Sequence, residues 1–276
     1  MKKDTLIDIF KKASLARHFE TKVFDLVKNG IIKIPVYLSA GEEYIPATLS
    51  TIWKGDSPQI FAQHRAHSTY LAFGGSIEQL IDELLEKSTG CARGMGGSAS
   101  IQSKEINMYG HDGMLGSQVP IAVGACHANK KPTLAILGDA SAEEDYVLAA
   151  MGYAATKKLP ILFVVSDNNL CVLTEKKIRR SWSITDVAKG FGIEAFECED
   201  CPEEIEKQYN KFSKYPGLLN VNTNRLFWHA GAGIDPEIKK DQYQMQKKLL
   251  GDIAIAIDLK IKTEVEELWK KQLEIQ

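Results

Sequence analysis

Two apolar stretches of the sequence are each followed by polar residues that could bind a metal ion. Leu134–Leu137 runs into Gly138-Asp139, and Ile161–Val165 is followed shortly by Asn168. Carboxylate and amide oxygens are hard ligands that suit Mg²⁺, which commonly binds together with phosphate oxygens. The carboxyl ends of neighbouring parallel strands meet at one edge of a sheet, so we expect Asp139 and Asn168 to lie together there. This pattern predicts a metal–diphosphate site.

A structural role explains the same residues equally well at this stage. Asp and Asn are common helix-cap and turn residues. A helix is expected to start after Ser141, and its first N–H groups would favour an anion at the same edge. The segment alone leaves both interpretations open.

The elements that must hold these residues are predicted from the spacing of apolar residues. Helical spacing marks residues 4–28, 77–85 and 144–157, and short apolar runs mark strands at 60–62, 133–137, 161–165 and 218–221. Strands that alternate with helices predict an α/β fold, a doubly wound parallel sheet flanked by helices. No repeat or linker divides the sequence, so we expect a single domain over 1–276 with a short helical C-terminal tail from about residue 236.

Composition narrows the class of protein. The 276 residues carry a net charge of −2, with 44 % hydrophobic and 25 % charged residues. These values are typical of a globular chain and argue against both disorder and nucleic-acid binding. Apolar runs are too short to cross a membrane, and the N-terminus lacks the apolar core of a signal peptide. The five scattered cysteines do not form a disulfide framework, so we expect a cytoplasmic protein.

Cys198 and Cys201 have the spacing of a metal or redox pair, but no second pair completes a zinc site. The acidic residues between them would raise a thiol pKa, so we expect a loop after a strand there.

Five segments in chain order carry a family resemblance. They are His64-Arg65-Ala66-His67, Gly90 to Ser98, Gly113 to Pro120, Gly138-Asp139 with Asn168, and Thr223-Asn224-Arg225 with His229. Together they resemble the alpha subunit of the thiamine diphosphate-dependent decarboxylating (first) component of 2-oxo acid dehydrogenase complexes, the group of the pyruvate, branched-chain and acetoin dehydrogenases. The resemblance extends from about residue 5 to residue 235 and implies the thiamine diphosphate-binding fold.

The resemblance also implies roles for individual residues. Asp139 and Asn168, with the Leu170 carbonyl, would hold Mg²⁺ on the diphosphate of thiamine diphosphate. Arg65 would contact the diphosphate, and His229 would act near the reacting carbon, orienting substrate or assisting acyl transfer. His67 is a second catalytic candidate. The other cofactor contacts implied are Gln63, His64, Gly113, Leu115, Gly138, Ala140 and Ser141.

The same resemblance implies partners. Family members keep the Glu that contacts the aminopyrimidine on a separate beta subunit, and no second domain here would supply it. We therefore expect an α2β2 heterotetramer that decarboxylates a 2-oxo acid and passes the acyl group to a lipoyl acyltransferase.

Two alternatives stay open. The first is the N-terminal subunit of a split transketolase-like enzyme, which would share Gly138-Asp139 and Asn168. The second is a degenerate, non-catalytic cofactor-binding subunit. Ala140 is the one hint of degeneration, since it stands where the family usually has Gly and would crowd the diphosphate if its φ were positive.

Overall fold

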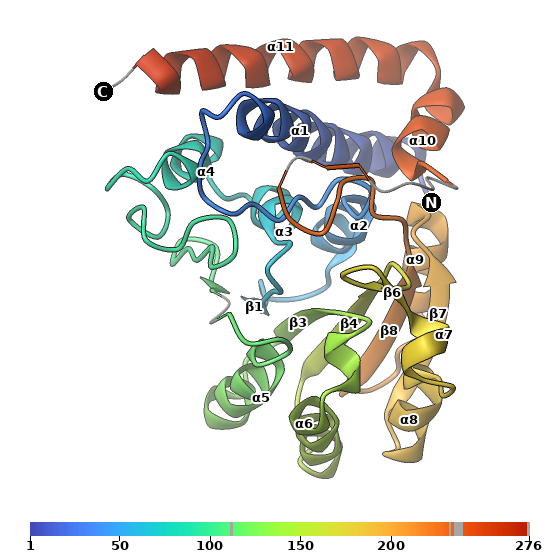
Figure 1. The fold of residues 1–276 in the computed structure, drawn as a ribbon. Helices are drawn as coiled ribbons and strands as arrows, with labels where there is room; N and C mark the ends of the chain where they lie inside the picture. Colours follow the sequence, from blue (N-terminus) through green and yellow to red (C-terminus); the bar gives the residue numbers. More distant parts are fainter. Residues whose placement is uncertain (111–112, 232, 235–239, 275–276) are drawn as a thin grey trace.

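A parallel β-sheet forms the centre of the protein. The structure is a computed structural model that describes residues 1–110, 113–231, 233–234 and 240–274. Within these residues the sheet has six strands in the order β2-β1-β3-β4-β8-β7 (Figure 1), and every neighbouring pair is parallel. The strands are β1 (Gln59–Phe61), β2 (Met108–Tyr109), β3 (Thr133–Gly138), β4 (Ile161–Asp167), β7 (Glu194–Glu199) and β8 (Gly217–Asn222).

Three helices cover one face of the sheet. They are α5 (Gln118–Asn129), α6 (Asp145–Thr156) and α8 (Ile184–Gly190), which lie below the sheet in Figure 1. Their apolar residues share a core with Ala135, Leu137 and Phe163 of the strands. The alternate strand residues Leu134, Ile136 and Leu162 belong to the core on the other face, so both faces are buried and the strands read as continuous apolar runs.

The other face carries a thicker cover. Its helices are α1 (Lys3–Lys28), α2 (Tyr44–Ile52), α3 (His67–Ala72), α4 (Ile77–Leu84), α9 (Pro202–Tyr209), α10 (Gln242–Leu250) and α11 (Asp252–Glu274). The long helices α1 and α11 lie side by side as the outermost layer (Figure 1), with the ring of Phe19 5.5 Å from that of Trp269. Helices on both faces of a parallel sheet are the predicted doubly wound architecture.

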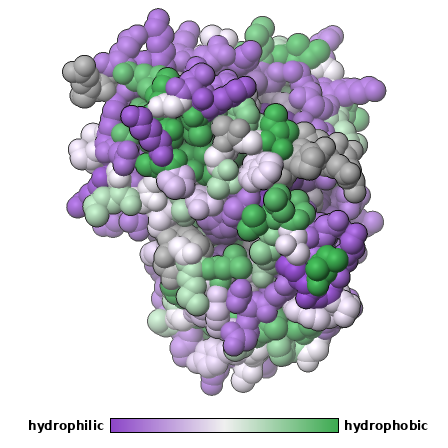
Figure 2. All heavy atoms as spheres, viewed as in Figure 1, coloured by the Kyte–Doolittle hydropathy of each residue, from purple (hydrophilic) through white to green (hydrophobic). Residues whose placement is uncertain are grey.

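Short elements surround the carboxyl edge of the sheet. They are η1 (Ser141–Glu143), the small hairpin β5 (Leu170–Cys171) and β6 (Thr174–Glu175), and α7 (Lys176–Arg179). Hydrophilic residues cover most of the face seen in Figure 2, with apolar groups between them. None of the described helices is both long enough and apolar enough to cross a membrane.

The helices predicted at 4–28, 77–85 and 144–157 and the four predicted strands all form, and their ends agree within two residues. The start predicted for the helical tail, about residue 236, lies outside the described residues, and the first described helix after it is α10. Strand β2 was not predicted because it is only two residues long. The prediction of a loop after a strand at Cys198 and Cys201 is wrong for Cys198, which lies within strand β7, whereas Cys201 lies beyond the end of that strand. Strand β7 is an edge strand in which only Ala195 and Cys198 are buried, and three of its other four residues are glutamates.

A buried loop segment, Ser39–Glu43, passes beneath the carboxyl edge of the sheet, and all five of its residues are buried. Gly41 adopts a φ of +98°, and a Cβ built there would lie 1.9 Å from the carbonyl oxygen of Asn224. The close approach brings the Ala40 carbonyl to the N–H of Leu226 (3.0 Å) and the Gly41 carbonyl to the Thr223 hydroxyl (2.9 Å). Only glycine fits both the backbone angle and the available space.

We predict that Gly41→Ala destabilises the chain severely, by more than about 4 kcal/mol, because backbone strain and a clash with backbone add. Gly55→Ala is the matched control, since Gly55 also has a positive φ (+82°) but has no atom within 4 Å of a built Cβ. Chemical denaturation should give a loss of only about 1 kcal/mol for the control. Equal losses for the two variants would contradict the steric argument.

Candidate functional site

A small cavity lies at the carboxyl ends of β3 and β4. Its volume is about 40 Å³. It brings together eleven of the residues predicted from sequence, along with Cys171 and Val172. Those eleven are Gln63, His64, Arg65, Leu115, Gly138, Asp139, Ala140, Ser141, Asn168, Leu170 and His229.

Asp139 and Asn168 lie in this cavity with different hydrogen-bond partners. The Asp139 carboxylate is buried and accepts a hydrogen bond from the Arg179 guanidinium of α7. Burial, and next the charge of Asp167, raise the pKa of Asp139 to about 6, against the opposing charge of Arg179. The Asn168 side-chain oxygen accepts from the Leu170 N–H (3.0 Å). These oxygens form a donor set that fits a hard divalent cation, and Arg179 is the cation that Asp139 already contacts.

Glu42 lies between Arg65 and Asn168, two of the residues that line the cavity. It is 4 % exposed, and its carboxylate accepts from Ser166 Oγ (2.8 Å) and Asn168 Nδ2 (2.8 Å). The Nε of Arg65 lies 3.9 Å from the same carboxylate. Arg65 also donates from Nη1 to the Leu38 carbonyl (3.1 Å). The orientation of Asn168 and the position of Arg65 therefore depend on one buried carboxylate.

The contact with Arg65 also determines which ring nitrogen of neutral His229 carries the proton. Arg65 Nη2 lies 3.0 Å from His229 Nδ1. A guanidinium only donates hydrogen bonds, so Nδ1 must be the acceptor and the ring proton of neutral His229 resides on Nε2. The ring of Tyr37 lies against the rings of His64 (centroids 4.8 Å apart) and His229 (5.8 Å).

The backbone of the cavity accepts alanine at position 140, where the family usually has glycine. Ala140 has φ −71° and ψ −37°, the right-handed helical region that any residue adopts. At Gly138, two residues earlier, a Cβ would lie 2.9 Å from Gln63 Oε1, so the close approach there is to Gln63. The structure therefore removes the steric argument for degeneration that Ala140 raised.

His67 does not line the cavity. It is fully buried, with Nδ1 3.1 Å from Glu20 Oε2 and Nε2 2.9 Å from Ser98 Oγ. Ser98 Oγ also accepts from the Tyr37 N–H (2.8 Å). His67 therefore holds the chain at Tyr37, and its catalytic assignment has no support from its position. Gly113 is likewise absent from the lining residues.

The segment from Gly90 to Ser98 is organised by one buried carboxylate. Glu83 Oε2 accepts from the N–H groups of Ala92 (2.7 Å) and Gly94 (2.9 Å), and Oε1 accepts from those of Gly96 (2.8 Å) and Gly97 (2.9 Å). Four charge-assisted bonds fix this loop. Its end, Ser98, is thereby placed against His67.

Glu42, Arg179 and Tyr37 were not predicted as site residues. Glu42 lies in an aperiodic segment, and Arg179 comes from a run of basic residues that resembles a solvated surface. Contacts across 40 positions, such as Arg179 to Asp139, leave no local pattern in a single sequence.

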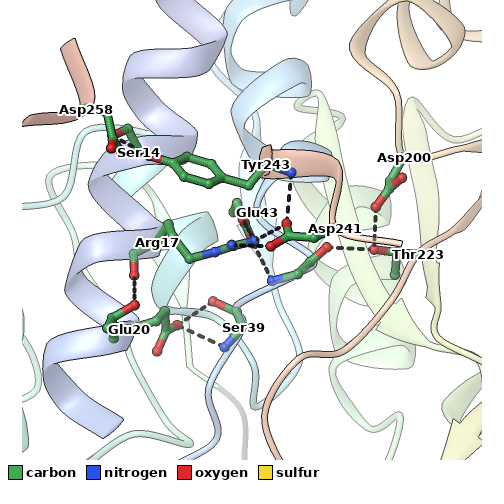
Figure 3. A network of polar contacts seen from close by, with 12 residues as sticks. Ser14, Arg17, Glu20, Ser39, Glu43, Asp200, Thr223, Asp241, Tyr243 and Asp258 are labelled. Carbon is green, nitrogen blue, oxygen red and sulfur yellow. Dashed lines mark hydrogen bonds and ion pairs between the residues drawn. The ribbon is translucent and has the colours of Figure 1, made fainter. Parts of the chain in front are cut away.

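A network of polar contacts links α1 to the buried segment Ser39–Glu43 (Figure 3). Arg17 of α1 contacts both Glu43 and Asp241, and Glu20 bonds to Ser39. Thr223 Oγ1 lies 2.9 Å from both Asp200 Oδ2 and the Gly41 carbonyl. A hydroxyl has one proton, so Thr223 donates to one of these two oxygens at a time. Burial raises the pKa of Asp200 to about 7, against the lowering effect of the Thr223 hydrogen bond and of the Lys240 charge.

Comparison with known proteins shows which family shares this arrangement. A sequence profile described as the dehydrogenase E1 component matches residues 11–200. The chain belongs to the dehydrogenase E1 component family. It is 35 % identical over 242 residues to the mitochondrial pyruvate dehydrogenase E1 component subunit alpha of Dictyostelium discoideum, covering 83 % of this chain and 63 % of that protein. The chain is also 30 % identical over 237 residues to the mitochondrial pyruvate dehydrogenase E1 component subunit alpha-1 of Oryza sativa subsp. japonica. That match covers 82 % of this chain and 60 % of that protein.

This E1 family chain thus spans about three fifths of the length of those two relatives. Among solved structures, transketolase from Leishmania mexicana matches 96 % of this chain and 46 % of its own with a TM-score of 0.63. Transketolase from Campylobacter jejuni matches 100 % of this chain and 49 % of its own with a TM-score of 0.61. At 14 % and 17 % identity these likenesses show a shared fold.

We predict that Asp200 makes the stability of the chain depend on pH. Its pKa is raised in the folded state, so the unfolded chain loses this proton first and stability falls as pH rises from about 4 to about 7. Asp200→Asn should remove this loss, and its advantage over the natural chain should grow over that interval to a few kcal/mol at most. Denaturation at several pH values measures the difference.

Asp186→Asn is the control, because the Asp186 side chain is 75 % exposed on α8. Its stability should follow that of the natural chain at every pH. A difference between Asp200→Asn and the natural chain that stays constant from pH 4 to 7 would contradict the assignment.

Proposed function

We propose that this chain is the alpha subunit of a thiamine diphosphate-dependent 2-oxo acid dehydrogenase. It would decarboxylate a 2-oxo acid and transfer the acyl group to a lipoyl carrier, together with a beta subunit. The observation that carries the proposal is the convergence of Asp139, Asn168 and Arg65 on one cavity at the carboxyl edge of the sheet. Family membership over residues 11–200 supports it.

The residues present fit a Mg²⁺–diphosphate group. Asp139, Asn168 and the Leu170 carbonyl offer one carboxylate and two neutral oxygens for Mg²⁺. Arg65 offers a buried guanidinium for a phosphate, and the N–H groups of Ala140 and Ser141 lie at the start of η1 in the same wall. Gln63, His64, Gly138 and Leu115 are the further contacts that we assign from the cavity, and Gly113 from the sequence.

Bound thiamine diphosphate supplies the electron sink that allows a 2-oxo acid to lose carbon dioxide. His229 presents its Nε2 proton, because Arg65 occupies Nδ1, and that proton would orient a substrate carboxylate or assist acyl transfer. Arg179 must share Asp139 with the metal ion or leave it, since both are cations that need the same carboxylate.

We further propose that the site is completed by a beta subunit in an α2β2 assembly. The cavity of about 40 Å³ is far below the roughly 300–1,000 Å³ of a ligand pocket, so the described residues enclose only part of a cofactor. The beta subunit would supply the Glu for the aminopyrimidine, and a lipoyl acyltransferase would receive the acyl group. A single domain over 1–276 fits this half-site. The five cysteines, all free, favour the cytoplasm.

We predict that Asp139→Asn weakens Mg²⁺-dependent binding of thiamine diphosphate about 100-fold, since losing a charged ligand costs roughly 3 kcal/mol. Calorimetry of the assembled alpha and beta subunits with the cofactor measures the affinity. Asp186→Asn should bind as tightly as the natural chain. Unchanged affinity in Asp139→Asn would contradict the metal assignment.

We expect the assembled subunits, supplied with thiamine diphosphate and Mg²⁺, to decarboxylate at least one 2-oxo acid from a panel of small linear and branched acids. Release of carbon dioxide is the measurement. An assembly that binds the cofactor and acts on sugar phosphates instead would point to the transketolase-like alternative. An assembly that binds the cofactor but turns over neither class would point to a non-catalytic subunit.

A further inference from the structure

A second, larger cavity lies beside the candidate site at the carboxyl ends of β4, β7 and β8. Its volume is about 570 Å³, within the usual range for metabolite-binding pockets. Its walls include Asp167 and Asn220 from the sheet and residues 180–184, which lead from α7 into α8. Neither the family resemblance nor the proposed function uses this cavity.

Arg180 is the unusual residue in the wall. It is 9 % exposed, and its Nε and Nη1 have no hydrogen-bond partner among the described residues. Its Nε lies 3.3 Å from Glu143 Oε1, and its Cζ lies 4.5 Å from the centre of the Trp182 ring. A buried guanidinium with unused donors is costly unless an anion satisfies them.

The other charges in the wall are already compensated. Lys176 is paired with Asp167, and Lys177 Nζ lies 2.8 Å from Glu175. Glu197 is exposed at the edge of the cavity. Arg180 is the buried cation of this wall; Glu143 lies within ion-pair distance of it, yet its Nε and Nη1 make no hydrogen bond within the described part of the chain.

Asn220 adds a hydrogen-bond acceptor to the donors of Arg180. It is buried in the same wall, and its amide nitrogen lies 3.3 Å from Asp167 Oδ2. Its Oδ1 has no partner among the described residues. An acceptor of this kind would be satisfied by a ligand that carries a hydroxyl or amino group. Trp182, 38 % exposed, adds an aromatic surface.

We propose that this cavity binds a small organic acid whose carboxylate pairs with the Arg180 guanidinium. A planar guanidinium matches a carboxylate through paired N–H donors. The body of the acid lies along Trp182, and a hydroxyl or amino donor next to the carboxylate reaches Asn220. A 2-hydroxy acid and a 2-amino acid both provide this chemistry, whereas a 2-oxo acid lacks the donor.

The first test is calorimetric titration of the 276-residue chain without thiamine diphosphate or Mg²⁺, so that the outcome does not depend on the proposed function. Benzoate should bind, and benzamide, its neutral isostere, should bind at least about tenfold more weakly. Mandelate and phenylalanine separate the two sources of the donor, and the one that binds more tightly than benzoate identifies the class. Equal binding of benzoate and benzamide, or none of either, would overturn the proposal. If neither mandelate nor phenylalanine exceeds benzoate, the role of Asn220 is refuted.

Substitutions in the cavity wall test whether the ligand binds at Arg180. Arg180→Met should weaken benzoate binding at least about tenfold. Lys189→Met, which removes a positive charge from an exposed position on α8, should leave it unchanged. Ser181→Glu keeps the test decisive if Arg180→Met fails to fold, because Ser181 is an exposed residue of the cavity wall. Its added carboxylate should compete for Arg180 and weaken benzoate to a similar extent. Full affinity in both Arg180→Met and Ser181→Glu would sink the assignment of this cavity.

Discussion

The structure depends on burying the carboxylates of Glu42 and Glu43 beneath the end of a parallel sheet. Two acidic residues in one buried segment are tolerated only because a guanidinium lies near each, Arg65 beside Glu42 and Arg17 against Glu43. These contacts join the N-terminal helix α1 and the candidate site to one buried segment. Removing one partner would leave the other charge buried, so the support of the cavity and the stability of the fold are governed by the same interactions.

The carboxyl edge of the sheet collects groups that are far apart in the chain. Asp139 and Asn168 arrive on neighbouring strands, Arg65 follows β1, and His229 comes from beyond β8. These groups are held by contacts with further residues of the chain. Glu42 orients Asn168, Arg65 orients His229, and His67 acts through Ser98 on the chain at Tyr37. Such hydrogen bonds fix the side chains that we propose hold the cofactor and its metal ion.

The sequence predicted the strands that carry the cavity because their apolar runs are buried on both faces. It also predicted most residues of the cavity, since Asp139, Asn168, Arg65 and His229 follow a family pattern. It did not predict Glu42 or Arg179, because their roles come from contacts between distant segments. For His67 the residue type suggested chemistry, whereas burial between Glu20 and Ser98 makes it a structural support. Propensity and spacing report on local structure, and neither reports which side chains meet.

The pairing of α1 with α11 has a consequence for how the chain is made. The apolar face of α1, including Phe19, is covered by Trp269 and its neighbours, which are synthesised well after α1 because they lie far along the chain. At roughly 5–20 residues per second, α1 would wait on the order of tens of seconds for that cover. During synthesis this helix therefore exposes an apolar surface that the ribosome-bound chain cannot yet bury. Premature termination before α11 would leave that surface permanently open to chaperones or to aggregation.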